Sequence, residues 1–495
     1  MSTIPNASSF YQSPSVPDAY LQSSQVVSLQ AEDVLNRFRT YCATVFPFVY
    51  VSPHITVQEF EKSQPFLWLC IKAVLSLSTT QQKVLGFRVR ETVSQRMLLA
   101  NERSLDLLLG LLVYLGMANP SMQNYKSYFS LFSQLAQALV FDLGLNKSIT
   151  ADQNQRPVDP GQIHLSGFKC PMQICGFFVS LGLKSPGARV RTMEERRAVL
   201  GCYYVTSTIV GYKQRIDGLR WTSHMAESLQ IMADKPEYSQ DTILVLLIRT
   251  RLIADKAGQL SRHDHSFHSP EPPPIFLMRA LDSELQETQR DISSRGKHDI
   301  PHAIRLSVSH TQLIIWENSL CGSSTSSDQL APELTRIEGL YKCLEAVKSW
   351  FDITSALPAA DYGRGPFPLF PALTHFLFIL HKLSTLKEPG WNRELVRTTI
   401  DMSEVLQTLA QKLEQVSAEC ICDSPDDSIF DKVVAFVKIM KEIIDARSSM
   451  TPDPQAGNIA PFATHTIEKE QKEDALKFPM DFANDAWLTE LLATM

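Results

Sequence analysis

Hydrophobic residues recur every three or four positions along most of this 495-residue chain, which is the spacing of amphipathic helices. Runs rich in leucine and phenylalanine are separated by short polar or proline-containing breaks. Outside the central stretch described next, helices are predicted near residues 30–42, 65–78, 81–99, 104–115, 122–145, 223–233, 239–261, 275–292, 303–319, 332–355, 371–386, 392–419 and 427–446. Successive helices with short connections predict an all-α fold, a multi-helix array or bundle.

The stretch at residues 191–222 is the centre of this pattern. Thr192 can cap the first turn of a helix, and the side chain of Glu195 can reach back to the Thr192 amide. The apolar residues that follow cover most of the helix circumference, so this helix is expected to be buried on nearly all sides. They are Val199, Leu200, Tyr203, Tyr204, Val205, Ile209 and Val210.

The helix is expected to end in a polar corner at residues 215–221, and the next helix to begin near Thr222. Gly218 permits a left-handed backbone in the corner, and Trp221 supplies a large apolar anchor. By residue chemistry alone this is a core helix with its turn. Its candidate structural residues are Thr192, Glu195, Arg196, Arg197, Tyr203, Asp217, Gly218 and Trp221.

Several short motifs in this region occur together in a fixed order. They are Arg191-Thr192, Glu195-Arg196-Arg197, Leu200-Gly201, Tyr203 and the corner from Arg215 to Thr222, with further matches upstream from Val45, Gln64, Ser104 and Leu139. Over roughly residues 30–232 this ordered set resembles the fungal-specific regulatory domain, the middle homology region of fungal binuclear-zinc-cluster transcription factors. The resemblance implies a nuclear, helical regulatory domain that controls a metabolic or secondary-metabolite gene cluster.

The zinc cluster of that family is not expected here. The family carries a basic, cysteine-rich, zinc-binding cluster where this chain has residues 1–28, which are rich in Ser, Pro and Gln and are predicted to be disordered. None of the 9 cysteines precedes Cys42, and no Cys-x-x-Cys pair occurs. The net charge is −6, and no stretch is dense in Lys and Arg. We therefore expect no direct DNA contact, and a DNA-binding transcription factor as partner.

Composition narrows the class of protein further. With 44% hydrophobic residues the chain can bury a substantial core, and no apolar run is long enough to predict a membrane span. The N-terminus lacks the apolar core of a secretion signal. An odd number of scattered cysteines is typical of reduced thiols inside a cell.

The chain is predicted to divide into four parts. Residues 1–28 form a disordered segment, 29–447 the helical regulatory domain, 448–475 a linker, and 476–495 an acidic-hydrophobic tail. Within the helical domain, residues 146–190 are rich in Gly and Pro and read as a long loop.

The tail places aromatic and aliphatic residues on one face of a short helix, with acids between them. These candidate partner-binding residues are Phe478, Phe482, Trp487, Leu488, Leu491 and Leu492. Leu488, Leu491 and Leu492 form an LxxLL pattern, so the tail either recruits a coactivator or the transcription machinery, or docks as a last helix on the core. Both readings stay open.

Two stretches carry residues that could support catalysis or metal binding. Asp426, Asp427 and Asp431 resemble the aspartate-rich magnesium motif of all-α terpene synthases, but acids are also ordinary at a helix start. A His-rich stretch at residues 263–268 lies beside prolines in an expected surface loop. We predict no catalytic residue, no cofactor and no metal.

The sequence thus favours a non-enzymatic transcription regulator, in which a hydrophobic cavity between helices could hold a small-molecule effector. The alternatives are a magnesium-dependent terpene-synthase-like enzyme and a plain helical interaction scaffold.

Overall fold

The computed structural model describes residues 31–76, 78–117, 128–147, 191–212, 217–263, 275–294, 300–320, 330–363, 365–366, 368–419 and 429–449. Within these ranges the chain forms helices and contains no β-strand, which confirms the all-α prediction. Among the same residues, no helix combines the length and the apolar character needed to cross a membrane.

Three groups of helices follow one another along the chain. The first comprises α2 (Ala31–Arg37), η1 (Phe38–Cys42), α3 (Ala43–Val45), α4 (Val57–Ser63), α5 (Pro65–Leu75), α6 (Thr79–Val93), η2 (Ser94–Leu99), α7 (Leu105–Gly116) and α8 (Phe129–Asp142). The second comprises α10 (Met193–Tyr212), α11 (Ser223–Asp234), α12 (Ser239–His263), α13 (Ile275–Ser294), α14 (His302–Trp316) and η6 (Glu317–Leu320). The third comprises α15 (Leu330–Ala356), α16 (Ala359–Gly363), α17 (Leu369–Thr385), α18 (Arg393–Thr399), α19 (Met402–Glu419) and α20 (Ile429–Ser449).

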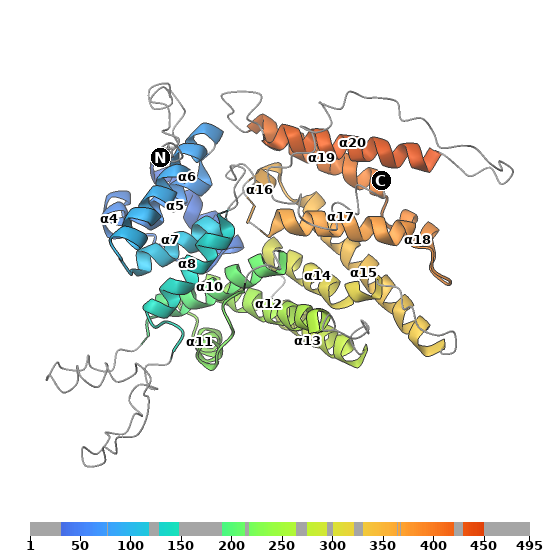
Figure 1. The fold of residues 1–495 in the computed structure, drawn as a ribbon, viewed down its shortest axis with the longest axis horizontal. Helices are drawn as coiled ribbons and strands as arrows, with labels where there is room; N and C mark the ends of the chain where they lie inside the picture. Colours follow the sequence, from blue (N-terminus) through green and yellow to red (C-terminus); the bar gives the residue numbers. More distant parts are fainter. Residues whose placement is uncertain are drawn as a thin grey trace, which may run out of the picture.

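These groups are arranged along the long axis of the molecule. Figure 1 shows α4 to α8 at one end, α17 to α20 at the other, and α10, α12 and α14 between them. One continuous hydrophobic cluster runs through all three groups. The middle helices therefore pack against both ends, and any cavity among them has walls from distant parts of the chain.

The start of α5 shows how the sequence fixes the N-terminal group. Pro65 occupies the first position of α5, where its missing N–H costs nothing. The carboxylate of Asp106 on α7 accepts hydrogen bonds from the backbone N–H groups of Phe66, at 3.2 Å, and Leu67, at 2.9 Å. An acid from a neighbouring helix thus satisfies N–H groups that the helix itself leaves unpaired.

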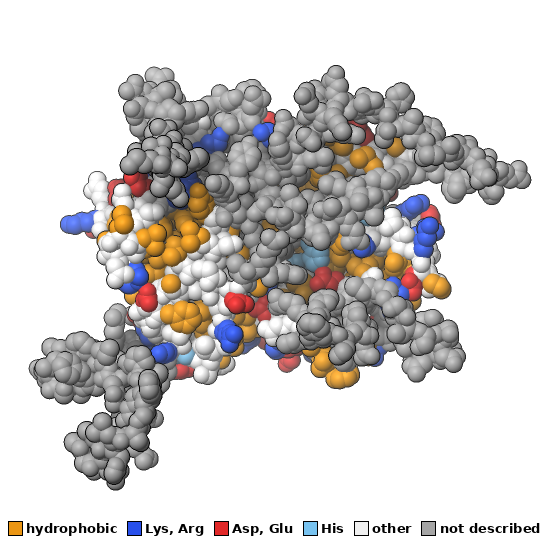
Figure 2. Space-filling model, viewed as in Figure 1, with side chains coloured by type: hydrophobic (Ala, Val, Ile, Leu, Met, Phe, Trp, Pro, Cys, Tyr) orange, Lys and Arg blue, Asp and Glu red, His pale blue; other side chains and the backbone are white. Residues whose placement is uncertain are grey.

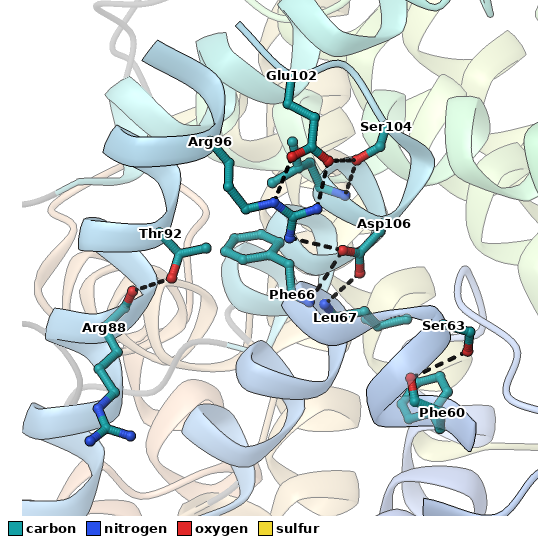
Figure 3. Close-up of polar contacts among 11 residues, drawn as sticks. Phe60, Ser63, Phe66, Leu67, Arg88, Thr92, Arg96, Glu102, Ser104 and Asp106 are labelled. Atoms are coloured by element: carbon teal, nitrogen blue, oxygen red, sulfur yellow. Dashed lines mark hydrogen bonds and ion pairs between the residues drawn. The ribbon is translucent and has the colours of Figure 1, made fainter. Parts of the chain in front are cut away.

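The same carboxylate is held from a third element (Figure 3). Arg96, in the π-helical segment η2, donates to Asp106 at 3.1 Å and makes a two-pronged ion pair with Glu102 at 2.6 and 2.7 Å. Ser104, the N-cap of α7, also donates to Glu102 at 2.9 Å. Because these bonds join η2, α7 and α5, they fix the angle between the first core helices.

Polar and apolar side chains are mixed on the surface of this end. On the face in Figure 2, exposed hydrophobic side chains lie over the α4–α8 end, with basic and acidic side chains interspersed. The large exposed hydrophobic residues of α6, η2 and α8 are Phe87, Leu98, Leu99, Leu131 and Phe141.

The structure departs from the predicted elements at three places. Helix α4 was missed, although Thr56 and Glu59 form a capping box at its start. The predicted helix at 392–419 is two helices, because Ile400 is extended and Asp401 caps α19 by accepting from the Glu404 N–H at 3.0 Å. The helix predicted to begin at residue 371 begins at Leu369, so Pro371 lies inside the first turn of α17, where proline is tolerated.

Candidate functional site

The predicted capping box opens α10. The Glu195 N–H donates to Oγ1 of Thr192 at 3.1 Å, and the Thr192 N–H donates to a carboxylate oxygen of Glu195 at 3.0 Å. Arg196 and Arg197, which the sequence placed in the core motif, are buried. Arg196 donates to Oγ of Ser228 on α11 at 3.0 Å. This helix is therefore enclosed even at its charged end.

Arg197 is the most deeply buried charge on α10. Its side chain is 3% exposed and makes a two-pronged ion pair, at 2.7 and 3.0 Å, with Asp241, whose side chain is 0% exposed. Asp241 also accepts from the backbone N–H groups of Glu237 and Tyr238, at 2.9 and 3.0 Å. The pair thus joins α10 to the capped start of α12. The sequence placed Arg197 in the core motif but gave no signal for Asp241 as its partner.

The corner after α10 departs from one prediction. Gly218 is not left-handed, since the residues with positive φ in the described chain are Asn101, Gly144 and Gly390. A Cβ atom at Gly218 would lie 3.3 Å from the Val210 side chain, so glycine here allows a close approach to α10. The backbone carbonyl of Asp217 accepts from the side chains of Gln134 and Gln137 on α8, at 3.0 and 3.1 Å.

Tyr203 connects the corner to a buried polar network. Its ring makes an edge contact with Trp221, with 4.8 Å between ring centroids. Its hydroxyl donates to Asp255 on α12 at 2.6 Å, and burial together with this carboxylate raises the pKa of Tyr203 far above its usual value. Asp255 also accepts from Ser207 and forms a two-pronged ion pair with Arg251.

This network borders a cavity of about 640 Å³ between the helices. Its walls come from α3, α10, α12, the start of α14, α15, α16 and the region leading into α17. Among the lining residues are Val45, Tyr204, Arg251, His310, Trp350 and Leu369. The volume falls within the range of small-molecule sites in proteins, about 300–1,000 Å³. This cavity is the candidate functional site.

Two titratable groups of the cavity, Tyr204 and His310, are held in their neutral forms. Burial raises the pKa of Tyr204 to about 12 despite the nearby Arg251. Burial, the adjacent His375 and Arg251 together lower the pKa of His310 well below its usual value. Nε2 of His310 lies 3.4 Å from Nδ1 of His375, and Nε2 of His375 lies 2.8 Å from the carboxylate of Glu317.

The cavity combines an apolar wall with a few hydrogen-bond donors, an arrangement suited to holding a small molecule. Such a cavity was expected from the sequence, but the residues that bring its polar groups together were not: Ser207, Arg251, Asp255, His310 and His375. They lie on four different helices, at sequence separations that no local motif connects. The sequence did carry one indication of these polar groups, because polar residues stand within otherwise apolar helix faces.

The other candidate residues of the sequence analysis are mostly outside the described chain. The tail at 476–495, Asp426, Asp427 and residues 264–268 all fall there. Asp431 lies in the first turn of α20 and accepts a hydrogen bond from Ser417 on α19. In the described part of the chain, His, Cys, Asp and Glu residues form no group of three or more that could hold a metal.

Comparison with known proteins adds the functional class. The chain is 33% identical over 392 residues to the transcription factor opdL of Penicillium oxalicum, an alignment that covers 79% of this chain and 66% of that protein. It is 22% identical over 427 residues to a transcription factor of Aspergillus terreus, covering 83% of this chain and 59% of the relative. It is 26% identical over 353 residues to the transcription factor himD of Aspergillus japonicus, covering 70% of this chain and 53% of that protein.

A family model described as a C-terminal domain matches residues 359–495, which begin at α16. No solved structure matches the chain. The chain spans two thirds or less of the length of each curated relative. The curated relatives are fungal transcription factors, and this similarity supports a transcription regulator and gives no support to the terpene-synthase alternative.

Proposed function

We propose that this protein regulates transcription in the nucleus and that its helical array is a regulatory domain of the fungal binuclear-zinc-cluster type. The observation that carries the proposal is the 33% identity over 392 residues to a fungal transcription factor, because it extends across most of the helical array. The ordered motifs around α10 add support, since they coincide with the capping box and the buried ion pair that organise the core.

In this proposal the chain makes no direct contact with DNA. A partner transcription factor reads the DNA instead. The target is a metabolic or secondary-metabolite gene cluster. The tail at 476–495 recruits a coactivator or the transcription machinery through its aromatic and leucine-rich face. The cavity bordered by α10, α12 and α14 is the effector site, and no catalytic step is assigned to it.

The test is chromatin immunoprecipitation of the tagged full-length protein in its native organism, together with RNA profiling of a deletion strain. We expect discrete promoter occupancy and the loss of a coherent set of transcripts. Absence of both would contradict a regulatory role.

A separate experiment tests whether the tail recruits the transcription machinery. Residues 476–495 fused to a foreign DNA-binding domain are expected to activate a reporter gene. The double variant W487A/L491A removes the apolar face and should abolish activation, whereas T489A, on the same short segment, should leave it intact. Equal activity of the two variants would show that the apolar face is not the recruiting surface.

A further inference from the structure

The least exposed charge of the cavity, Arg251, is paired within the protein. Arg251 is neutralised by Asp255, with N–O distances of 2.5 and 2.9 Å, and the hydroxyls of Tyr203 and Ser207 complete the shell around that carboxylate. The two other lining residues with permanent charges, Arg305 and Asp361, have opposite signs, and Arg305 is exposed to solvent. A ligand that carried a full charge to the inner part of the site, around Arg251, would therefore meet no unbalanced counter-charge.

Burial disfavours an additional charge of either sign. An ion loses its hydration on entering a low-dielectric site, and the free energy of that loss exceeds what one hydrogen bond contributes. His310 is consistent with this cost, because burial keeps its imidazole neutral beside Arg251 and His375. The inner part of the site thus disfavours cations, and its one cationic side chain, Arg251, is already paired with Asp255.

Tyr204 offers a ligand a hydrogen-bond donor in a fixed position. The hydroxyl of Tyr204 makes no hydrogen bond to any described part of the protein, and the residue lines the cavity. Its ring is fixed against Phe48, with 4.8 Å between ring centroids, so the position of the hydroxyl is set in advance. As a neutral phenol it can donate a hydrogen bond to a carbonyl or ether oxygen.

The apolar part of the lining favours a flat body. Trp350 lines the cavity and is held by stacking on Phe376, with 4.6 Å between ring centroids and 18° between ring planes. Leu357 and Leu369, together with Pro366 and Pro368, extend this apolar wall. Aromatic rings pack favourably on such a surface.

We propose that the cavity binds a neutral, ring-containing molecule that accepts a hydrogen bond from Tyr204. The proposal rests on the effector role assigned to the cavity above, and it specifies the chemistry of the ligand. It predicts discrimination against charged analogues of the same shape.

The experiment uses the full-length protein and two fluorescent probes that share one ring system. N-phenyl-1-naphthylamine is neutral, and 8-anilinonaphthalene-1-sulfonate is its sulfonated anion. We expect the neutral probe to bind at one site at least about tenfold more tightly than the anion, because burying the unpaired sulfonate is costly. Equal or tighter binding of the anion would overturn the proposal.

Two variants decide whether the probe occupies this cavity. Ala303 lines the cavity near the start of α14, so A303W should fill the site and reduce affinity at least about tenfold. Ala226, exposed in the first turns of α11, provides the matched control, and A226W should leave binding unchanged. Unchanged binding in A303W would place the probe on the outer surface and refute the proposal.

A second pair of molecules tests the role of Tyr204. 2-Acetylnaphthalene should displace the neutral probe more effectively than 2-ethylnaphthalene, which lacks the carbonyl acceptor, by about two- to tenfold. Tyr204→Phe should remove this preference while leaving the affinity for 2-ethylnaphthalene unchanged. If the preference survives in Tyr204→Phe, the hydroxyl is not the donor. These binding results do not depend on promoter occupancy, so the ligand proposal and the regulatory role can fail separately.

Discussion

Removing the guanidinium of Arg197 is expected to destabilise the protein by about 3–5 kcal/mol. The R197M variant keeps most of the apolar length of the side chain but leaves the carboxylate of Asp241 buried without its counter-charge. In the wild-type protein the Asp241 side chain is 0% exposed, and its two oxygens accept hydrogen bonds from the Arg197 guanidinium at 2.7 and 3.0 Å. The cost is large because a buried charge can neither be hydrated nor move to a new partner.

An exposed pair of similar length provides the control. Arg279 on α13 and Glu338 on α15 lie 2.6 Å apart, but their side chains are 56% and 40% exposed. R279M is expected to cost at most about 1 kcal/mol, since water replaces the lost partner. Urea unfolding followed by far-ultraviolet circular dichroism measures both variants. Equal losses for R197M and R279M would refute the argument from burial.

A double-mutant cycle separates the charge from the packing. D241N removes the negative charge and retains an oxygen that can accept from the backbone N–H groups at the start of α12. The double variant R197M/D241N should therefore lose less stability than the sum of the two single variants. A strictly additive result would mean that Arg197 and Asp241 stabilise the core independently.

Three further predictions concern other contacts of the core. A methyl group at Gly201 would lie 2.8 Å from Cβ of Phe48, so G201A should cost about 1–3 kcal/mol in urea unfolding. D106A removes the hydrogen-bond acceptor at the start of α5 and a partner of Arg96, and should cost about 2–3 kcal/mol by the same assay. The lowered pKa of His310 means that protonation favours the unfolded chain. Its stabilising contribution is present above about pH 6.5 and lost as the pH falls towards the folded-state pKa, so thermal unfolding at pH 7 and pH 5 should differ less in H310Q than in wild type.

Local chemistry explains which parts of the fold could be predicted. The helices at α5, α7 and α10 each carry a start signal that acts within four residues, such as Pro65, Ser104 or Thr192 with Glu195. The spacing of hydrophobic residues predicts the remainder of each of these helices. The break between α18 and α19 was missed because the apolar spacing continues across it, and only the cap at Asp401 marks it.

The candidate site depended on contacts that no local pattern encodes. Arg251 and Asp255 are four residues apart on α12 and read as an ordinary surface pair in the sequence. The structure buries them because Tyr203 and Ser207 on α10 face the same carboxylate. Long-range packing thus converted a common helix pair into the polar edge of a cavity.

The position of the cavity suggests how a ligand could act on the whole array. Its lining begins at Tyr41 in the N-terminal group and ends at Ala372, within the region that matches the C-terminal family model. A molecule bound there touches all three groups of helices at once. A ligand changes a conformational equilibrium only through a difference in affinity between the two states. The walls of the cavity belong to different groups of helices, so a shift of either end alters the contacts with the ligand. Two arrangements of the helices would therefore differ in their affinity for the ligand. We therefore expect ligand binding to change the packing at both ends of the helical array, including the end formed by α19 and α20, rather than at the cavity alone.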